Sequence, residues 1–118
     1  MAAAYVSNLV INAGASFNQT FNLANTTDGS YLDLTQYDIS AQMRKHAVSS
    51  VKTEFATSIE DASQGKFALS LTSEQTTSLK PGRYVYDVVL TVTGTTEKTR
   101  VVEGMVLVRE GVTRYWQI

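Results

Sequence analysis

Short runs in which apolar and polar residues alternate follow one another along most of the chain. In the clearest run, residues 38–45, the apolar positions Ile39, Ala41 and Met43 alternate with polar ones. A period of two is typical of a strand that buries one face and exposes the other. Three further runs repeat it, with the odd-numbered positions Phe17, Phe21 and Leu23, then Phe55, Thr57 and Ile59, and then Phe67, Leu69 and Leu71.

The last third of the chain predicts a long antiparallel hairpin of residues 83–93 and 98–109, joined around Gly94. A tight loop there places Tyr86 opposite Gly104, and the same register places two carboxylates, Asp87 and Glu103, opposite each other. The first strand has a continuous apolar face on its even positions, which predicts core residues at Tyr84, Tyr86, Val88, Leu90 and Val92.

The same strand also has valines on its odd face, which would be polar if it met only water. Val85 and Val89 occupy that face. We therefore predict that this face is partly covered, either by the C-terminal segment of the chain or by a neighbouring subunit.

One helical turn interrupts the strands near residues 73–79. Thr72 or Ser73, followed by Gln75 or Thr76, has the pattern of a helix N-cap, and Pro81 stops the turn. Turn signals every 8 to 12 residues elsewhere are typical of β-sandwiches. The sequence thus predicts a single all-β domain over residues 1–118, an immunoglobulin-like antiparallel β-sandwich of about seven strands with one short helical turn.

Composition excludes several classes of function. The chain has 118 residues, 43% of them hydrophobic, a formal net charge of −1 and no cysteine. Disulfides, thiol nucleophiles and cysteine-based zinc sites are therefore impossible. Nucleic-acid binding is not expected, because basic residues are not clustered. The start of the chain does not resemble a signal peptide and no apolar run is long enough for a membrane helix, so we expect no membrane partner.

Residues that could carry chemistry are sparse. His46 is the single histidine, and one imidazole without partners forms no multi-histidine metal site. A facing Asp87 and Glu103 would be a catalytic pair only inside a cleft, which the hairpin pattern does not imply. We expect a protein that is not an enzyme and has no metal or cofactor. The remaining acidic candidates for a calcium loop lack the required compact spacing: Asp28, Asp33 and Asp38.

The end of the sequence is rich in residue types that dominate protein interfaces. Residues 113–118 read TRYWQI. Two interpretations stay open: this segment docks on a partner, or it folds back as an edge strand over its own core. Residues 1–4 are a second possible docking terminus. The predicted interface residues are Val85, Val89, Arg114, Tyr115, Trp116 and Ile118.

Four stretches, in this order along the chain, resemble a known family: INAGASFNQTFNL, DGSYLDLTQYDISAQMRK, SLTSEQTTSLKPGRYVYDVVLT and RVVEGMVLVREGVTR. Together they resemble the small immunoglobulin-like domains of tailed-bacteriophage virion proteins. Such domains include the N-terminal domains of baseplate upper proteins and small structural proteins of phage tails and necks. The resemblance runs from about Leu9 to Arg114, and it carries over no catalytic residue.

The resemblance implies a non-enzymatic building block of a tailed-phage particle, made in the host cytoplasm and located in the virion. Its implied partners are other virion proteins and copies of itself in a symmetric assembly. Two alternatives remain. One is a carbohydrate- or receptor-binding module that uses exposed tyrosines such as Tyr31 and Tyr37. The other is a decoration protein of the capsid surface. An enzyme accessory domain rests on analogy of fold alone.

Overall fold

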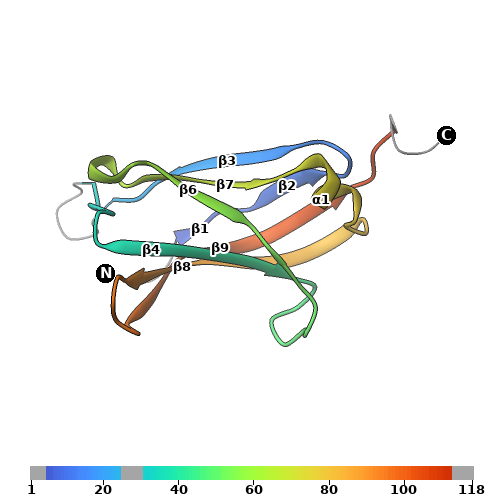
Figure 1. Cartoon of the computed structure of the whole chain (residues 1–118). Coiled ribbons are helices and arrows are strands. Elements are labelled where there is room, and N and C mark those ends of the chain that lie inside the picture. Colours follow the sequence, from blue (N-terminus) through green and yellow to red (C-terminus); the bar gives the residue numbers. More distant parts are fainter. Residues whose placement is uncertain (1–4, 25–30, 113–118) are drawn as a thin grey trace.

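The protein is a sandwich of two β-sheets, which lie one above the other in Figure 1. The computed structural model describes residues 5–24 and 31–112. The larger sheet, sheet A, has the strand order β1–β9–β8–β4–β5, with β2 also paired to β9, and the smaller sheet B has the order β3–β7–β6. In chain order the elements are β1 (Tyr5–Val6), β2 (Leu9–Asn12), β3 (Phe17–Asn22), β4 (Tyr37–Arg44), β5 (Lys52–Glu54), β6 (Ala56–Asp61), the 3₁₀ turn η1 (Ala62–Gln64), β7 (Lys66–Leu71), α1 (Ser73–Thr77), β8 (Gly82–Val92) and β9 (Lys98–Arg109).

This architecture confirms the predicted all-β sandwich with one short helical turn. The described residues contain nine strands rather than about seven. The expected strand around Phe55 is divided, because β5 and β6 belong to different sheets, and two short strands, β1 and β2, follow each other along the same edge of β9.

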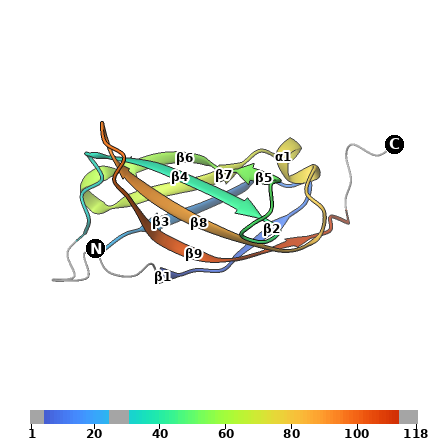
Figure 2. The ribbon, with the colours of Figure 1, turned by 90° about the horizontal axis from the view of Figure 1, so that it is seen from below.

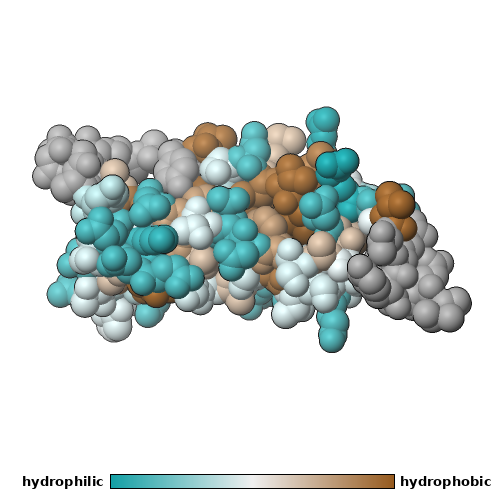
Figure 3. Space-filling view, turned by 90° about the horizontal axis from the view of Figure 1, so that it is seen from above, coloured by the Kyte–Doolittle hydropathy of each residue, from teal (hydrophilic) through white to brown (hydrophobic). Residues whose placement is uncertain are grey.

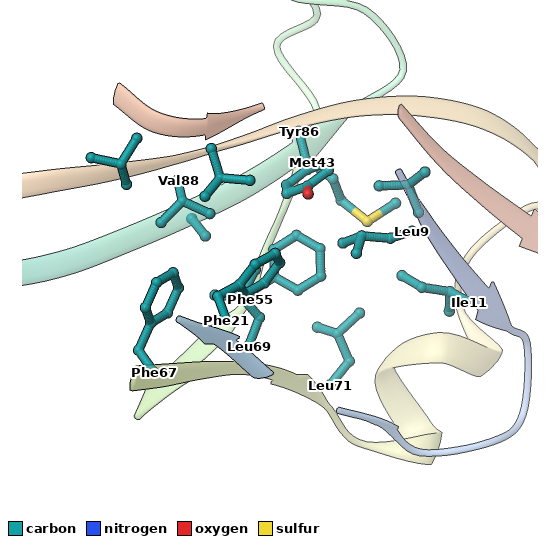
Figure 4. Close-up of a cluster of buried hydrophobic side chains, with 14 of the residues drawn as sticks. Leu9, Ile11, Phe21, Met43, Phe55, Phe67, Leu69, Leu71, Tyr86 and Val88 are labelled. Carbon is teal, nitrogen blue, oxygen red and sulfur yellow. The ribbon is translucent and has the colours of Figure 1, made fainter. Parts of the chain in front are cut away.

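The core lies between the two sheets and is built by the alternating positions of the strands. Figure 4 shows Met43, Tyr86 and Val88 of sheet A facing Phe21, Phe67, Leu69 and Leu71 of sheet B. On β8 the prediction holds best in the middle of the strand, where Tyr86, Val88 and Leu90 are buried. Tyr84 and Val92, nearer its ends, are only half-buried.

The run around Phe55 does not form one strand, so that prediction was wrong. Residues 52–54 pair with β4 in sheet A, whereas residues 56–61 pair with β7 in sheet B. Phe55 is the crossing point: its N–H donates to the Ala41 carbonyl at 3.0 Å and its ring is buried between the sheets. Every residue of β6 is exposed, Ile59 included, because β6 is the outermost strand of the smaller sheet.

The helical turn is confirmed, and its N-cap is Thr72. The Thr72 hydroxyl accepts from the Gln75 N–H at 3.2 Å, while the Gln75 side chain accepts from the Thr72 N–H at 2.8 Å. This reciprocal pair is a capping box, which satisfies two backbone donors at the start of the helix. The helix then buries Thr76, whose hydroxyl accepts from the Gly14 N–H at 3.0 Å and lies 2.9 Å from the Ala15 carbonyl. In this way α1 holds the turn between β2 and β3.

The β8–β9 hairpin has the predicted register in its central part, with Tyr86 opposite Gly104 and Asp87 opposite Glu103. The connection is longer than a tight three-residue loop, since residues 93–97 separate the strands. A bulge restores the register: Val88 pairs with Val102 but Val89 pairs with Arg100, so the extra residue is the buried Val101.

Candidate protein interface

The outer face of sheet A, which points toward the viewer in Figure 2, carries a group of exposed apolar side chains. They come from neighbouring strands, because Val10 of β2 lies opposite Leu107 of β9, and Val85 of β8 lies opposite Met105 of β9. Their exposed fractions range from 37% to 67%. We call this group the apolar patch: Val6, Val10, Val85, Met105 and Leu107.

The apolar patch exists because β9 is apolar on both faces. Its inward residues Val106 and Val108 are buried in the core, and the alternation of a strand turns Met105 and Leu107 outward. Contiguous apolar surface on a soluble domain commonly marks a contact site. The patch is therefore the strongest candidate for a functional surface among the described residues.

An ionic cluster borders the patch on the same face. Asp87 and Glu103 lie opposite each other across β8 and β9, and Arg100 contacts both. The Arg100 Nε is 3.1 Å from an Asp87 carboxylate oxygen, and the Arg100 Nη1 is 3.4 Å from Glu103 Oε1. Like charges directly opposite each other destabilise a sheet. Here the guanidinium between them offsets that repulsion, while two carboxylates for one cation leave a net negative charge.

A second border of the patch is formed by polar residues of β4, next to the ionic cluster, since Gln42 pairs with Asp87. Arg44, which pairs with Val85, donates to the Ser49 carbonyl at 2.5 Å and to the Gln42 side chain at 3.0 Å. Gln42 in turn donates to Glu54 at 3.1 Å. These bonds fix the polar side chains in place, so the border is ordered before any partner arrives.

The surface is hollowed where these two borders meet the patch. The hollow has a volume of about 630 Å³, and Val85 and Met105 contribute apolar lining. Arg44 and His46 line one side, and Arg100 and Glu103 line the other. An apolar floor with charged walls suits a large amphipathic side chain, such as an aromatic residue, better than a purely polar ligand.

The opposite face of the molecule, that of sheet B, is less organised. In Figure 3, which views the sandwich from that side, apolar atoms form separate areas among hydrophilic side chains. The strands of this sheet contribute mainly exposed polar residues there, for example Asn18 and Thr20 of β3. The apolar patch of sheet A thus distinguishes the two faces.

The structure divides the predicted interface residues. Val85 belongs to the apolar patch and is 37% exposed. Val89 lies on the same face but beyond Asp87, opposite Arg100, and is half-buried by its neighbours. Residues 1–4 lie outside the described residues. So do four of the predicted interface residues, Arg114, Tyr115, Trp116 and Ile118.

Most of the patch was not predicted as a site. On this face only Val85 and Val89 of β8 were predicted as interface residues, so Met105, Leu107, Val6 and Val10 escaped prediction. The sequence of β9 does indicate an apolar outer face, because Met105 and Leu107 alternate with buried valines and no position from Met105 to Val108 is polar. The pairing of β2 with β9, by contrast, is parallel and joins the two ends of the chain, which no local pattern reveals.

Of the residues considered for chemistry, His46, Asp87 and Glu103 line the hollow on sheet A, whereas Asp33 and Asp38 do not, and Asp28 lies outside the described residues. His46 is exposed in the connection after β4. Asp33 accepts from the Thr35 hydroxyl and from the Thr35 N–H, and the hydroxyl contributes most to holding the pKa of Asp33 below its usual value. Within residues 5–24 and 31–112, no three histidine, aspartate or glutamate residues come together as a metal site would need. No helix in the described part is long and apolar enough to cross a membrane.

The two tyrosines considered for glycan binding differ in exposure. Tyr31 is 55% exposed. Tyr37 packs against the core and is half-buried.

The fold is that of a two-sheet β-sandwich domain, and comparison with known proteins extends this description without naming a family. No protein-family model matches the chain, and no curated protein matches it in sequence. Among solved structures, the N-terminal domain of ORF48 of phage TP901-1 has a TM-score of 0.54 at 9% identity. The match covers 92% of this chain and 99% of that domain.

A second similar structure is InlP of Listeria monocytogenes, with a TM-score of 0.50 at 12% identity over 89% of this chain. The chain spans about a quarter of InlP, since the match covers 26% of that protein. At such identities the likeness concerns the fold alone. A sandwich of this shape therefore occurs both as an entire domain of a phage protein and as one part of a larger bacterial protein.

Proposed function

We propose that the chain is a non-enzymatic structural component of a tailed-phage particle, in the baseplate, tail or neck, and acts as an assembly module through protein–protein contacts. In this role it is part of the virion, and its partners are other virion proteins and further copies of itself. The observation that carries the proposal is the apolar patch on the outer face of sheet A. A sheet face that holds five exposed apolar side chains beside ordered charged residues suits permanent contact with protein.

Two further observations support it. The carboxylates that line the hollow, Asp87 and Glu103, both contact the Arg100 guanidinium, which suits the charged rim of a protein contact. The fold also occurs in a phage protein over that domain's full length. Because one fold hosts many functions, this second point supports the proposal without deciding it.

Incorporation into particles tests the proposal. Particles of the phage that encodes the chain are purified with the wild-type protein, with Val10→Asp or with Leu107→Asp, and the copies per particle are measured by quantitative mass spectrometry. We expect the wild-type chain at fixed stoichiometry and a loss of at least about tenfold for both variants, since a charge buried in an interface is costly.

Val48→Asp is the matched control, because Val48 is 89% exposed in the loop after β4 and neither belongs to the apolar patch nor lines the hollow. It should enter particles at the wild-type level. Absence of the wild-type chain from purified particles would contradict the proposal. So would normal incorporation of both patch variants.

A further inference from the structure

The C-terminal segment, residues 113–118, matches the outer face of sheet A in spacing and in chemistry. In extended conformation every second side chain points to one side, so Arg114, Trp116 and Ile118 share a face. On β9 the outward residues Glu103, Met105 and Leu107 have the same spacing of two. The three side chains of either set span about 13 Å from first to last.

The residue types of the segment match those of β9 only if the two run parallel. Parallel to β9, Arg114 faces Glu103 in the ionic cluster, Trp116 faces Met105 at the hollow, and Ile118 faces Leu107. Glu103 shares the Arg100 guanidinium with Asp87, so its carboxylate can accept a second guanidinium from Arg114. In the antiparallel direction Arg114 would meet the apolar Leu107, and Ile118 would meet Glu103.

The described chain leads away from its own patch. After β9 it runs past the end of the sandwich and turns toward the side of sheet B, as Figure 1 shows. Val112, the last described residue, is 96% exposed, so no packing holds it against its own domain. The described chain therefore ends toward sheet B and not over the outer face of its own sheet A.

We infer that residues 113–118 of one copy bind the apolar patch of a second copy, parallel to β9, with Trp116 in the hollow between Arg44 and Arg100. This inference rests on the proposed function and names the partner as another copy of the chain. The contact is heterologous, because the segment of one copy meets the face of the next. Such contacts form rings when the rotation closes and filaments when it does not.

Two variants of the full chain test this arrangement by complementation. Trp116→Ala removes the side chain that fills the hollow but leaves the apolar patch intact. Leu107→Asp places a charge in the apolar patch but keeps Trp116. Sedimentation velocity should show a self-associated wild-type chain, and each variant alone should associate at least about 30-fold more weakly, as for a hot-spot residue. An equimolar mixture of the two variants should form a one-to-one dimer, because only one productive contact remains.

Fluorescence gives an independent readout, since Trp116 is the single tryptophan of the chain. In the mixture only the Leu107→Asp copy fluoresces, and its emission should shift to the blue as the partner is added. Tyr115→Ala is the matched control, because Tyr115 lies on the other side of the extended segment and its loss should leave association within about threefold of wild type. Circular dichroism shows whether each variant is folded, and Val10→Asp serves as the patch variant if Leu107→Asp is not.

Three results would overturn the inference. A wild-type monomer with a solvent-exposed tryptophan means that the segment does not bind. A monomer whose tryptophan stays shielded on dilution means that it covers its own domain. Association without complementation in the mixture means that two faces pair symmetrically. Each of these leaves the particle-incorporation result unaffected, so the proposed function stands or falls separately.

Discussion

Tyr86 lies directly opposite Gly104 in the β8–β9 ladder, and its hydroxyl donates to the carbonyl of Ser7, which crosses over that glycine. The Ser7 N–H donates to the Glu103 carbonyl at 2.9 Å, and the Met105 N–H donates to the Asn8 side chain at 3.0 Å. At Ser7 and Asn8 the backbone thus leaves the regular strand and passes close over Gly104, which divides β1 from β2. Only a residue without a side chain leaves room for this close approach.

Gly104→Ala should therefore be strongly destabilising. A Cβ at this position would lie 2.2 Å from the Ser7 carbonyl oxygen, and backbone atoms move only at the cost of the surrounding hydrogen bonds. We expect a loss of about 2–4 kcal/mol in the free energy of unfolding, measured in urea. Gly94→Ala is the control: its site has open space but a positive φ of 81°, so only about 1 kcal/mol should be lost. Equal effects at the two glycines would contradict the steric argument.

Tyr86→Phe isolates the hydroxyl at the same junction. It keeps the buried ring, which packs edge-on against Phe55 at a centroid distance of 6.2 Å, but it leaves the Ser7 carbonyl without this donor. We expect a loss of about 1 kcal/mol. Tyr84→Phe removes a comparable bond, 2.7 Å long, to the exposed Lys80 carbonyl, where water replaces the donor, and should cost less. A larger loss for Tyr84→Phe would show that the Tyr86 bond is weak.

Thr76→Val tests the link between α1 and the β2–β3 turn. Valine has nearly the shape of threonine, but it leaves the Gly14 N–H and the Ala15 carbonyl without the hydroxyl that joins them. Because Thr76 is fully buried, we expect a loss of about 2–3 kcal/mol in urea unfolding. Thr76→Ser keeps the hydroxyl and loses only a methyl group, so it should retain more stability than Thr76→Val. The reverse order would show that packing rather than hydrogen bonding holds this turn.

The sequence was most informative where local pattern and burial agree. Alternation located the middle of β4, β7 and β8, and the Thr72–Gln75 spacing located α1. Both patterns depend only on residues that are close together in the sequence. The sheet switch at Phe55 escaped prediction since alternation is the same on either side of it. The apolar patch escaped for another reason: it joins β1, β2, β8 and β9, and the parallel pairing of the first two with the last is set by tertiary packing.

The turn at Asp33 predicts a small dependence on pH. The Thr35 hydroxyl and N–H bond the ionised carboxylate and lower the pKa of Asp33 below its ordinary 3.8. A depressed folded pKa adds stability that is present above the unfolded value and lost as pH falls through the folded one. Thr35→Ala should therefore raise the pKa of Asp33, as followed by NMR of its carboxyl carbon, and should slightly lower the stability at pH 7 while leaving the stability below the folded pKa unchanged. An unchanged pKa would show that the hydroxyl does not bond the carboxylate in solution.

Arg100→Gln tests whether the guanidinium is needed to place Asp87 opposite Glu103. Without the cation the two carboxylates repel each other across the hairpin, so the variant should be less stable by up to about 1 kcal/mol at low salt. Added salt should shrink that difference, because these side chains are exposed and screened. Adding Asp87→Asn to Arg100→Gln should restore most of the lost stability, since one of the two like charges is removed. If the double variant is no more stable than Arg100→Gln, repulsion between Asp87 and Glu103 is not what Arg100 offsets.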